Sequence, residues 1–148
     1  MSPHFGLMDE SKMSKKEGLL LRSKLHWRCG VRRMREGKTS AGLATLYDAL
    51  LSAMRWYILT HMRNELGDNG DEKIENERLV FCLLRRAGVL DNSFDLKFLE
   101  EIVDKALMGE DVSCDQDRVM AQLQQFLTRI GVLPFDETEL PPENTDTL

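Results

Sequence analysis

Cysteine is scarce in this chain, and its few copies are far apart. The three cysteines are Cys29, Cys82 and Cys114. Their number is odd, and they lack the close pairs that disulfide frameworks and zinc sites use. This pattern excludes a disulfide-stabilised scaffold and indicates a reducing compartment, so we expect a cytoplasmic protein.

Histidine is equally scarce, with His4, His26 and His61 in three separate segments. A carboxylate metal site in a helical bundle uses Glu-x-x-His motifs, and the sequence has none. Its glycines form no phosphate-binding loop. Cys29 lies one helical turn from His26, but a cysteine on a bundle helix is usually inert packing. The sequence therefore predicts no metal and no cofactor.

Long hydrophobic runs are also absent. The longest run of leucine is Leu19–Leu21, and Arg22 ends it. A signal peptide needs 7 or more apolar residues in its central region and a membrane-spanning helix needs about 20. We therefore expect no membrane association.

The bulk composition is that of one ordinary globular domain. The chain has 148 residues, of which 42% are hydrophobic and 30% charged, and its net charge is −5. The charge is unevenly distributed, because residues 1–63 carry 12 Lys/Arg and 5 Asp/Glu whereas residues 64–148 carry 8 and 20. Such asymmetry indicates either an acidic partner for the basic half or packing of the two halves on each other. We expect packing.

The stretch Ser40–Leu66 is the most hydrophobic helical pattern in the chain. It contains no proline, and its apolar residues follow the helical spacing i, i+3, i+4, i+7. Only a narrow strip that includes Asp48 and Arg55 stays polar. A helix that is apolar over most of its circumference must be buried over most of it. We predict that this is the central helix of an all-α bundle, with Leu50 and Met54 in the core.

Four further helices complete the predicted bundle. They span residues 14–35, 72–87, 91–108 and 115–130. Ser14 has Glu17 three residues later, the spacing of a capping box. Gly88-Val89-Leu90 and Gly131-Val132-Leu133 read as two copies of one helix stop, a glycine followed by two apolar residues. We predict a flexible arm at residues 1–13, a single domain of five mostly antiparallel helices at 14–133 and an acidic disordered tail at 134–148.

The first helix carries two stripes. Its predicted core stripe consists of Leu20, Trp27, Val31 and Met34. Its basic line consists of Lys24, Arg28, Arg32 and Arg35, which share one face at positions i, i+4, i+8 and i+11. We expect the basic line to pack on the acidic face of the fourth helix, at Glu100, Glu101 and Asp104. The alternative is that the line binds phosphate groups of a nucleic acid.

One spacing on the central helix resembles a ribonuclease motif. Arg55 and His61 enclose five residues, and an Arg followed by four to six residues and a His is the catalytic motif of HEPN domains. The run RMREGKTSAGLATLYDALLSAMRWYIL resembles the first helical hairpin of that family. The later runs ERLVFCLLRRAGVLD, FDLKFLEEIVDKAL and DQDRVMAQLQQFLTRI are similar to its remaining helices. The resemblance implies an all-α HEPN-like domain.

The motif departs from the family pattern in two ways. The HEPN pair lies late in the domain and a polar residue follows its Arg, whereas here no histidine follows His61 and Trp56 follows Arg55. Six positions on a helix also rotate the two side chains about 120° apart. We therefore expect a non-catalytic HEPN-like interaction module that binds another protein or itself, including as a dimer. The alternatives are a metal-independent ribonuclease that uses Arg55 and His61, and a nucleic-acid binder that uses the basic first helix.

Overall fold

The computed structural model of the chain describes residues 12–143, and its regular secondary structure is helical. Within that range no strand is present, so the predicted all-α fold is confirmed. The helices are α1 (Lys15–Arg35), α2 (Thr39–His61), α3 (Arg63–Leu66), α4 (Gly70–Lys73), α5 (Glu77–Arg86), α6 (Leu96–Leu107) and α7 (Gln116–Arg129). Two 3₁₀ turns, η2 (Ser113–Asp115) and η3 (Glu137–Glu139), flank α7.

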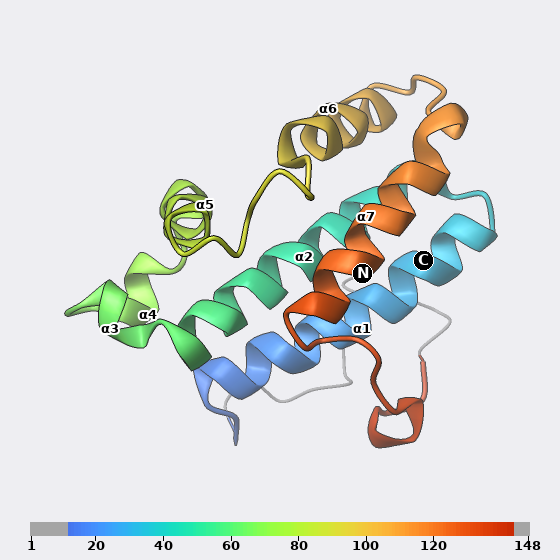
Figure 1. The fold of residues 1–148 in the computed structure, drawn as a ribbon. Coiled ribbons are helices and arrows are strands. Elements are labelled where there is room, and N and C mark those ends of the chain that lie inside the picture. Colours follow the sequence, from blue (N-terminus) through green and yellow to red (C-terminus); the bar gives the residue numbers. More distant parts are fainter. Residues whose placement is uncertain (1–11, 144–148) are drawn as a thin grey trace.

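The bundle is organised around α2, as predicted. Figure 1 shows α1 and α2 as a long antiparallel hairpin, with α7 alongside it and with α5 and α6 on the other side of α2 from α1. Leu46, Leu50, Met54 and Ile58 follow one another along α2 and have no exposed surface. Side chains from α5, α6 and α7 join them in one hydrophobic core.

Two glycines allow α1 and α2 to approach each other closely. A Cβ atom on Gly30 of α1 would lie 2.7 Å from both Cγ and Cδ2 of Leu46, and one on Gly42 of α2 would lie 2.6 Å from Sδ of Met34. Atoms in contact are normally separated by more than 3.4 Å. The distance between the two helices therefore depends on the absence of side chains at these positions.

Gly30→Ala is expected to lower the free energy of unfolding by about 1–3 kcal/mol, because the added methyl group forces the buried Leu46 to move. This loss exceeds the gain in helix propensity, which is about 1 kcal/mol. Urea unfolding of Gly30→Ala, Leu46→Ala and the double variant measures it. Since Leu46→Ala creates space for the methyl group, the double variant should lose less than the sum of the single losses. A stability at or above wild type for Gly30→Ala would contradict the close approach.

The most buried face of α1 differs from the predicted stripe. Leu20, Trp27, Val31 and Met34 are only half-buried, although they contact the core. The fully buried positions include Ser23, His26, Cys29 and Arg33. Polar side chains are accepted there because α2 supplies partners: the Ser23 hydroxyl donates to the Ala49 carbonyl at 2.8 Å, and Arg33 donates to the Thr45 hydroxyl at 2.5 Å.

Asp48 of α2 joins two side chains of α1 in a polar cluster. Arg22 donates two hydrogen bonds to its carboxylate, at 2.9 and 3.1 Å, and Nδ1 of His26 lies 2.7 Å from Oδ2. Burial alone would raise the pKa of Asp48, but the interactions with His26 and Arg22 outweigh it and hold the pKa well below its usual range. The carboxylate is therefore a charged link between α1 and α2.

The structure corrects the predicted extent of two helices. The central helix ends at His61 rather than Leu66, and the predicted helix 72–87 is divided into α4 and α5. The division has a local cause, because the Asn76 side chain caps α5 by accepting from the Leu79 amide at 3.2 Å. Arg55 adds a tertiary cause by donating to the carbonyls of Ile74 and Glu75, at 3.0 and 3.3 Å.

Other predicted boundaries agree closely with the structure. The Ser14 hydroxyl accepts from the Glu17 amide at 3.2 Å and caps α1. Gly88 and Gly131 both have positive φ, at 74° and 94°, so each ends its helix in the left-handed conformation that glycine favours. One start is shifted, because Asp95 rather than Asp91 or Ser93 caps α6.

The beginning of the predicted tail is not a loose extension. Residues 134–143, which we call the strap, leave the end of α7 and loop out below α1 in Figure 1, and Glu143 contacts Arg32 of α1. Leu140 is buried, with 9% of its surface exposed, and this anchor opposes the disorder that the acidic, proline-containing composition predicted. The rest of the predicted tail, residues 144–148, and most of the predicted arm, residues 1–11, lie outside the described part of the chain.

Candidate functional site

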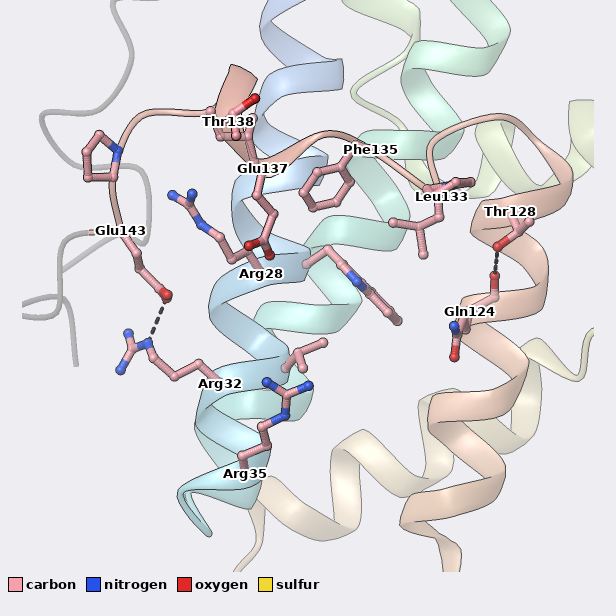
Figure 2. A pocket seen from close by; sticks show the side chains of 15 residues that line it. Arg28, Arg32, Arg35, Gln124, Thr128, Leu133, Phe135, Glu137, Thr138 and Glu143 are labelled. Atoms are coloured by element: carbon pink, nitrogen blue, oxygen red, sulfur yellow. Dashed lines mark hydrogen bonds and ion pairs between the residues drawn. The ribbon is translucent and has the colours of Figure 1, made fainter.

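Three of the four residues of the basic line border a groove on α1. Arg28, Arg32 and Arg35 line a cavity of about 1070 Å³, which we call the arginine groove. Trp27 and Val31 contribute an apolar surface between the arginines. Figure 2 shows the three arginines one above another along α1. Lys24 is half-buried on the same helix but does not line the cavity.

The opposite walls come from α7 and from the strap. The cavity is lined by Gln124 and Thr128 of α7. Strap residues that line it include Phe135, Leu140 and Glu143. Figure 2 shows the strap passing over α1 and Glu143 extending toward Arg32. The groove therefore combines cationic, carboxylate and apolar surface, the composition of a site for a polar chain rather than for a small hydrocarbon.

The guanidinium group of Arg32 forms hydrogen bonds to three side chains. Its Nε donates to Glu143 at 2.7 Å, one terminal nitrogen donates to Glu36 at 2.9 Å, and the other approaches Sγ of Cys29 at 3.6 Å. The hydrogen bond to Glu143 raises the pKa of Arg32 above its usual value, against the opposing effect of burial. Arg32 is thus permanently charged and directs its planar fork at carboxylates.

Arg28 differs from Arg32, since its buried Nε has no partner within residues 12–143. Among the described residues, no acceptor forms a hydrogen bond with its buried Nε. A buried donor without an acceptor costs about 1–3 kcal/mol. The guanidinium group of Arg28 nevertheless lines the groove, so its charge favours an anionic occupant there.

The groove continues along α1 toward the start of α7. A second cavity of about 450 Å³ shares Trp27, Val31, Arg35 and Gln124 with the first and extends to Met120. The α1–α7 seam is therefore open over several helical turns, long enough for an extended segment of protein.

The prediction that the basic line packs on the acidic α6 is wrong. Within the described residues, no ion pair joins the line to Glu100, Glu101 or Asp104. The reason is the position of α6, which lies on the other side of α2 from α1 (Figure 1). Arg32 of the line instead pairs with Glu36 and with Glu143, which lies 111 positions away in the sequence.

The structure places Arg55 and His61 in separate environments. Arg55 is committed to the backbone carbonyls of Ile74 and Glu75. His61 is the last residue of α2, is exposed, and packs its ring on Tyr57 with a centroid separation of 4.7 Å. Arg55 lines a cavity with Arg22 and Glu75, and His61 is not part of that lining.

Sequence reasoning missed the strap as part of the site. Composition alone predicts that Glu143 and Leu140 belong to a disordered tail. The available signal was the interruption of the acidic run by apolar residues, since Phe135 and Leu140 alternate with acids in PFDETELPPE. A segment that stays solvated and disordered usually contains few large apolar side chains.

Residues 12–143 contain neither a cluster of metal ligands nor a membrane-spanning helix. No group of three or more His, Cys, Asp or Glu side chains there is arranged to hold a metal ion. Nor does any helix in that range have the length and apolar character needed to cross a membrane.

No protein-family model matches this chain, and neither a curated protein nor a solved structure matches it.

Proposed function

We propose that this chain is a non-catalytic, cytoplasmic binding module of the HEPN-like type, which binds another protein through the arginine groove. The observation that carries the non-catalytic part is the engagement of Arg55. Its Nε and a terminal nitrogen donate to the carbonyls of Ile74 and Glu75, and these bonds hold the link between α4 and α5. Two of the guanidinium nitrogens of Arg55 are thus engaged in holding the fold, which favours a structural role for this arginine.

Helix order and the cysteines support the other parts of the proposal. The hairpin α1–α2 followed by α5, α6 and α7 corresponds to the runs that resemble HEPN domains. Cys29 is buried, Cys82 and Cys114 are exposed, and all three are free thiols. Free exposed thiols are typical of a reducing compartment.

The same groove favours a protein partner over a small molecule. Arg32 already contacts two carboxylates, from Glu143 and Glu36, and Trp27 and Val31 add apolar surface. Arginine and tryptophan are enriched among residues that dominate the energy of protein–protein interfaces. Self-association through this groove is included in the proposal.

We expect no ribonuclease activity. Structured and single-stranded RNA incubated with the purified chain should stay intact on a denaturing gel, because Arg55 and His61 are not brought together. The chain with Arg55→Ala and the chain with His61→Ala serve as matched controls, so that cleavage by a contaminant is recognised by its persistence in both. RNA cleavage that disappears in both variants would overturn the proposal. It would also require a dimer that pairs the two residues across subunits, which crosslinking would detect.

Nucleic-acid binding is a second candidate function, favoured by one observation. The buried Nε of Arg28 has no partner among the described residues, and Trp27 lies beside it in the groove lining. Arginine next to an aromatic ring is a common element of single-strand binding. Binding of this kind would fall with salt at a log–log slope of about −0.7 per phosphate contacted. The carboxylates of Glu137 and Glu143 in the same lining oppose it.

A further inference from the structure

The strap shows what kind of segment the arginine groove accepts. Glu143 accepts a charge-assisted hydrogen bond from Arg32 at 2.7 Å, and Leu140 is buried in the lining of the groove. The strap residues at both ends of η3 have extended backbone, with ψ of 114° at Asp136 and 149° at Leu140. The groove therefore holds a segment that joins carboxylates to a leucine.

The contacts that hold the strap are few and involve side chains. Its backbone hydrogen bonds are internal, from Glu139 to Asp136 and from Leu140 to Glu137, and none joins the strap to the rest of the described chain. Leu140 also lies outside the hydrophobic core cluster of the bundle. A segment without backbone pairing is displaced without breaking secondary structure, and local opening is easiest where buried apolar contacts are few.

The groove has binding capacity that the strap does not use. Arg28 retains a buried donor without a partner among the described residues, and the cavity of about 1070 Å³ remains between the strap, α1 and α7. Arg28 lines the cavity, so an occupant with a second carboxylate beside its guanidinium would add a charge-assisted bond to the one at Arg32. Such an occupant would form more charge-assisted bonds than the strap forms.

We propose that the arginine groove binds an extended, acidic, leucine-containing segment of a partner protein, and that the strap occupies part of this site as an internal competitor. The charge of the groove, the seated strap and the unused Arg28 donor all point to the same chemistry. The inference rests on the proposed function, since it names the class of partner for the same surface.

The test measures binding of a fluorescein-labelled peptide, PFDETELPPENTDTL, which repeats residues 134–148, to the full-length chain. Fluorescence anisotropy gives the Kd for wild type and for the double variant Leu140→Ala/Glu143→Gln, whose strap is loosened. We expect the loosened chain to bind about tenfold more tightly, because the strap no longer competes. Glu139→Gln is the matched control: its side chain is exposed and does not line the groove, so its Kd should equal that of wild type.

Groove variants test whether the peptide occupies the proposed site. In the loosened chain, Arg32→Gln should weaken peptide binding at least tenfold, because Arg32 bonds Glu143 of this sequence. Arg28→Gln should have a smaller effect, because Arg28 forms no hydrogen bond with the strap within the described residues. Unchanged thermal unfolding of either variant keeps the comparison valid, and Arg32→Lys, which keeps the charge but loses the planar fork, should be intermediate.

The outcomes distinguish failure of the acidic-segment proposal from failure of the proposed non-catalytic function. Equal peptide affinity in wild-type and loosened chains overturns the competition by the strap while leaving the groove as a protein-binding site. Failure of the loosened chain to bind the peptide overturns the groove as a site for acidic segments. Tighter binding of labelled RNA than of peptide, lost in Arg28→Gln, overturns it in favour of nucleic acid. Failure of the non-catalytic proposal is seen separately, as RNA cleavage.

Discussion

Leu50→Ala is expected to lower the free energy of unfolding by about 2–5 kcal/mol. Leu50 lies in the middle of α2, where it has no exposed surface, and α2 is packed by helices on both sides. Removal of three carbon atoms loses their transfer free energy and leaves a cavity that the surrounding helices fill only in part. Met54→Ala, one turn further along the same buried face, should fall in the same range.

Urea unfolding followed by circular dichroism measures this loss. Leu107→Ala is a matched control, because it makes the same change on a helix at a residue that is 60% exposed. It should alter stability by no more than about 0.5 kcal/mol. Similar small effects for Leu50→Ala and Leu107→Ala would show that α2 is not the centre of the core.

Asp48→Asn is expected to lower the free energy of unfolding by about 2–4 kcal/mol at neutral pH. The substitution keeps the shape of the side chain but removes the charge that Arg22 and His26 share. His26 is 4% exposed, so it would lose its charged partner in a place that water does not reach. Asp71→Asn is the matched control, since the pair of Asp71 with Arg63 is exposed and such pairs contribute about 0–1 kcal/mol.

The effect of Asp48→Asn should depend on pH with a definite sign. The folded pKa of Asp48 lies below that of an unfolded aspartate, which is about 3.9. Above that value both states are ionised and the full stabilisation is present. As the pH falls below it, the unfolded state takes up a proton first and the stabilisation is lost. The stability difference between wild type and Asp48→Asn should therefore shrink between pH 4 and 2. A difference that grows as the pH falls from 4 to 2 would contradict the assignment.

Features that depend on neighbouring residues could be predicted from the sequence. The stripe of Leu123, Phe126 and Leu127 on α7 is buried as its period indicates. The cap at Ser14 and the glycine stop at Gly88 also depend on residues a few positions away. The residues that determine these features lie within about one helical turn of each other, so they can be recognised in the sequence without knowledge of the fold.

Features that depend on residues distant in the sequence could not be predicted from the sequence. Burial of Ser23 and Arg33 is possible only because Ala49 and Thr45 on α2 accept their hydrogen bonds. A prediction from hydrophobic periodicity treats such polar side chains as exposed. The predicted buried face of α1 therefore differs from the face that the structure buries. The break before Asn76 was missed for the same reason, since Arg55 supplies part of its cause from another helix.

The candidate site follows the same division. The line of Arg28, Arg32 and Arg35 is visible in the sequence because its members are spaced along one helix face. Its partner is not, since Glu143 belongs to a segment whose composition indicates disorder and whose position depends on the turn at Gly131. The sequence thus predicted a cationic surface but assigned it to the wrong acidic helix.

The attachment of the strap to α7 sets a threshold for any partner. Because the turn at Gly131 keeps the strap beside the groove, its local concentration there is on the order of millimolar, as for other short tethers. A free segment that made only the contacts of the strap would need a comparable concentration to displace half of it. Selective occupancy at cellular concentrations therefore requires a partner that forms additional bonds, such as one to Arg28, or one that is held nearby by a second contact.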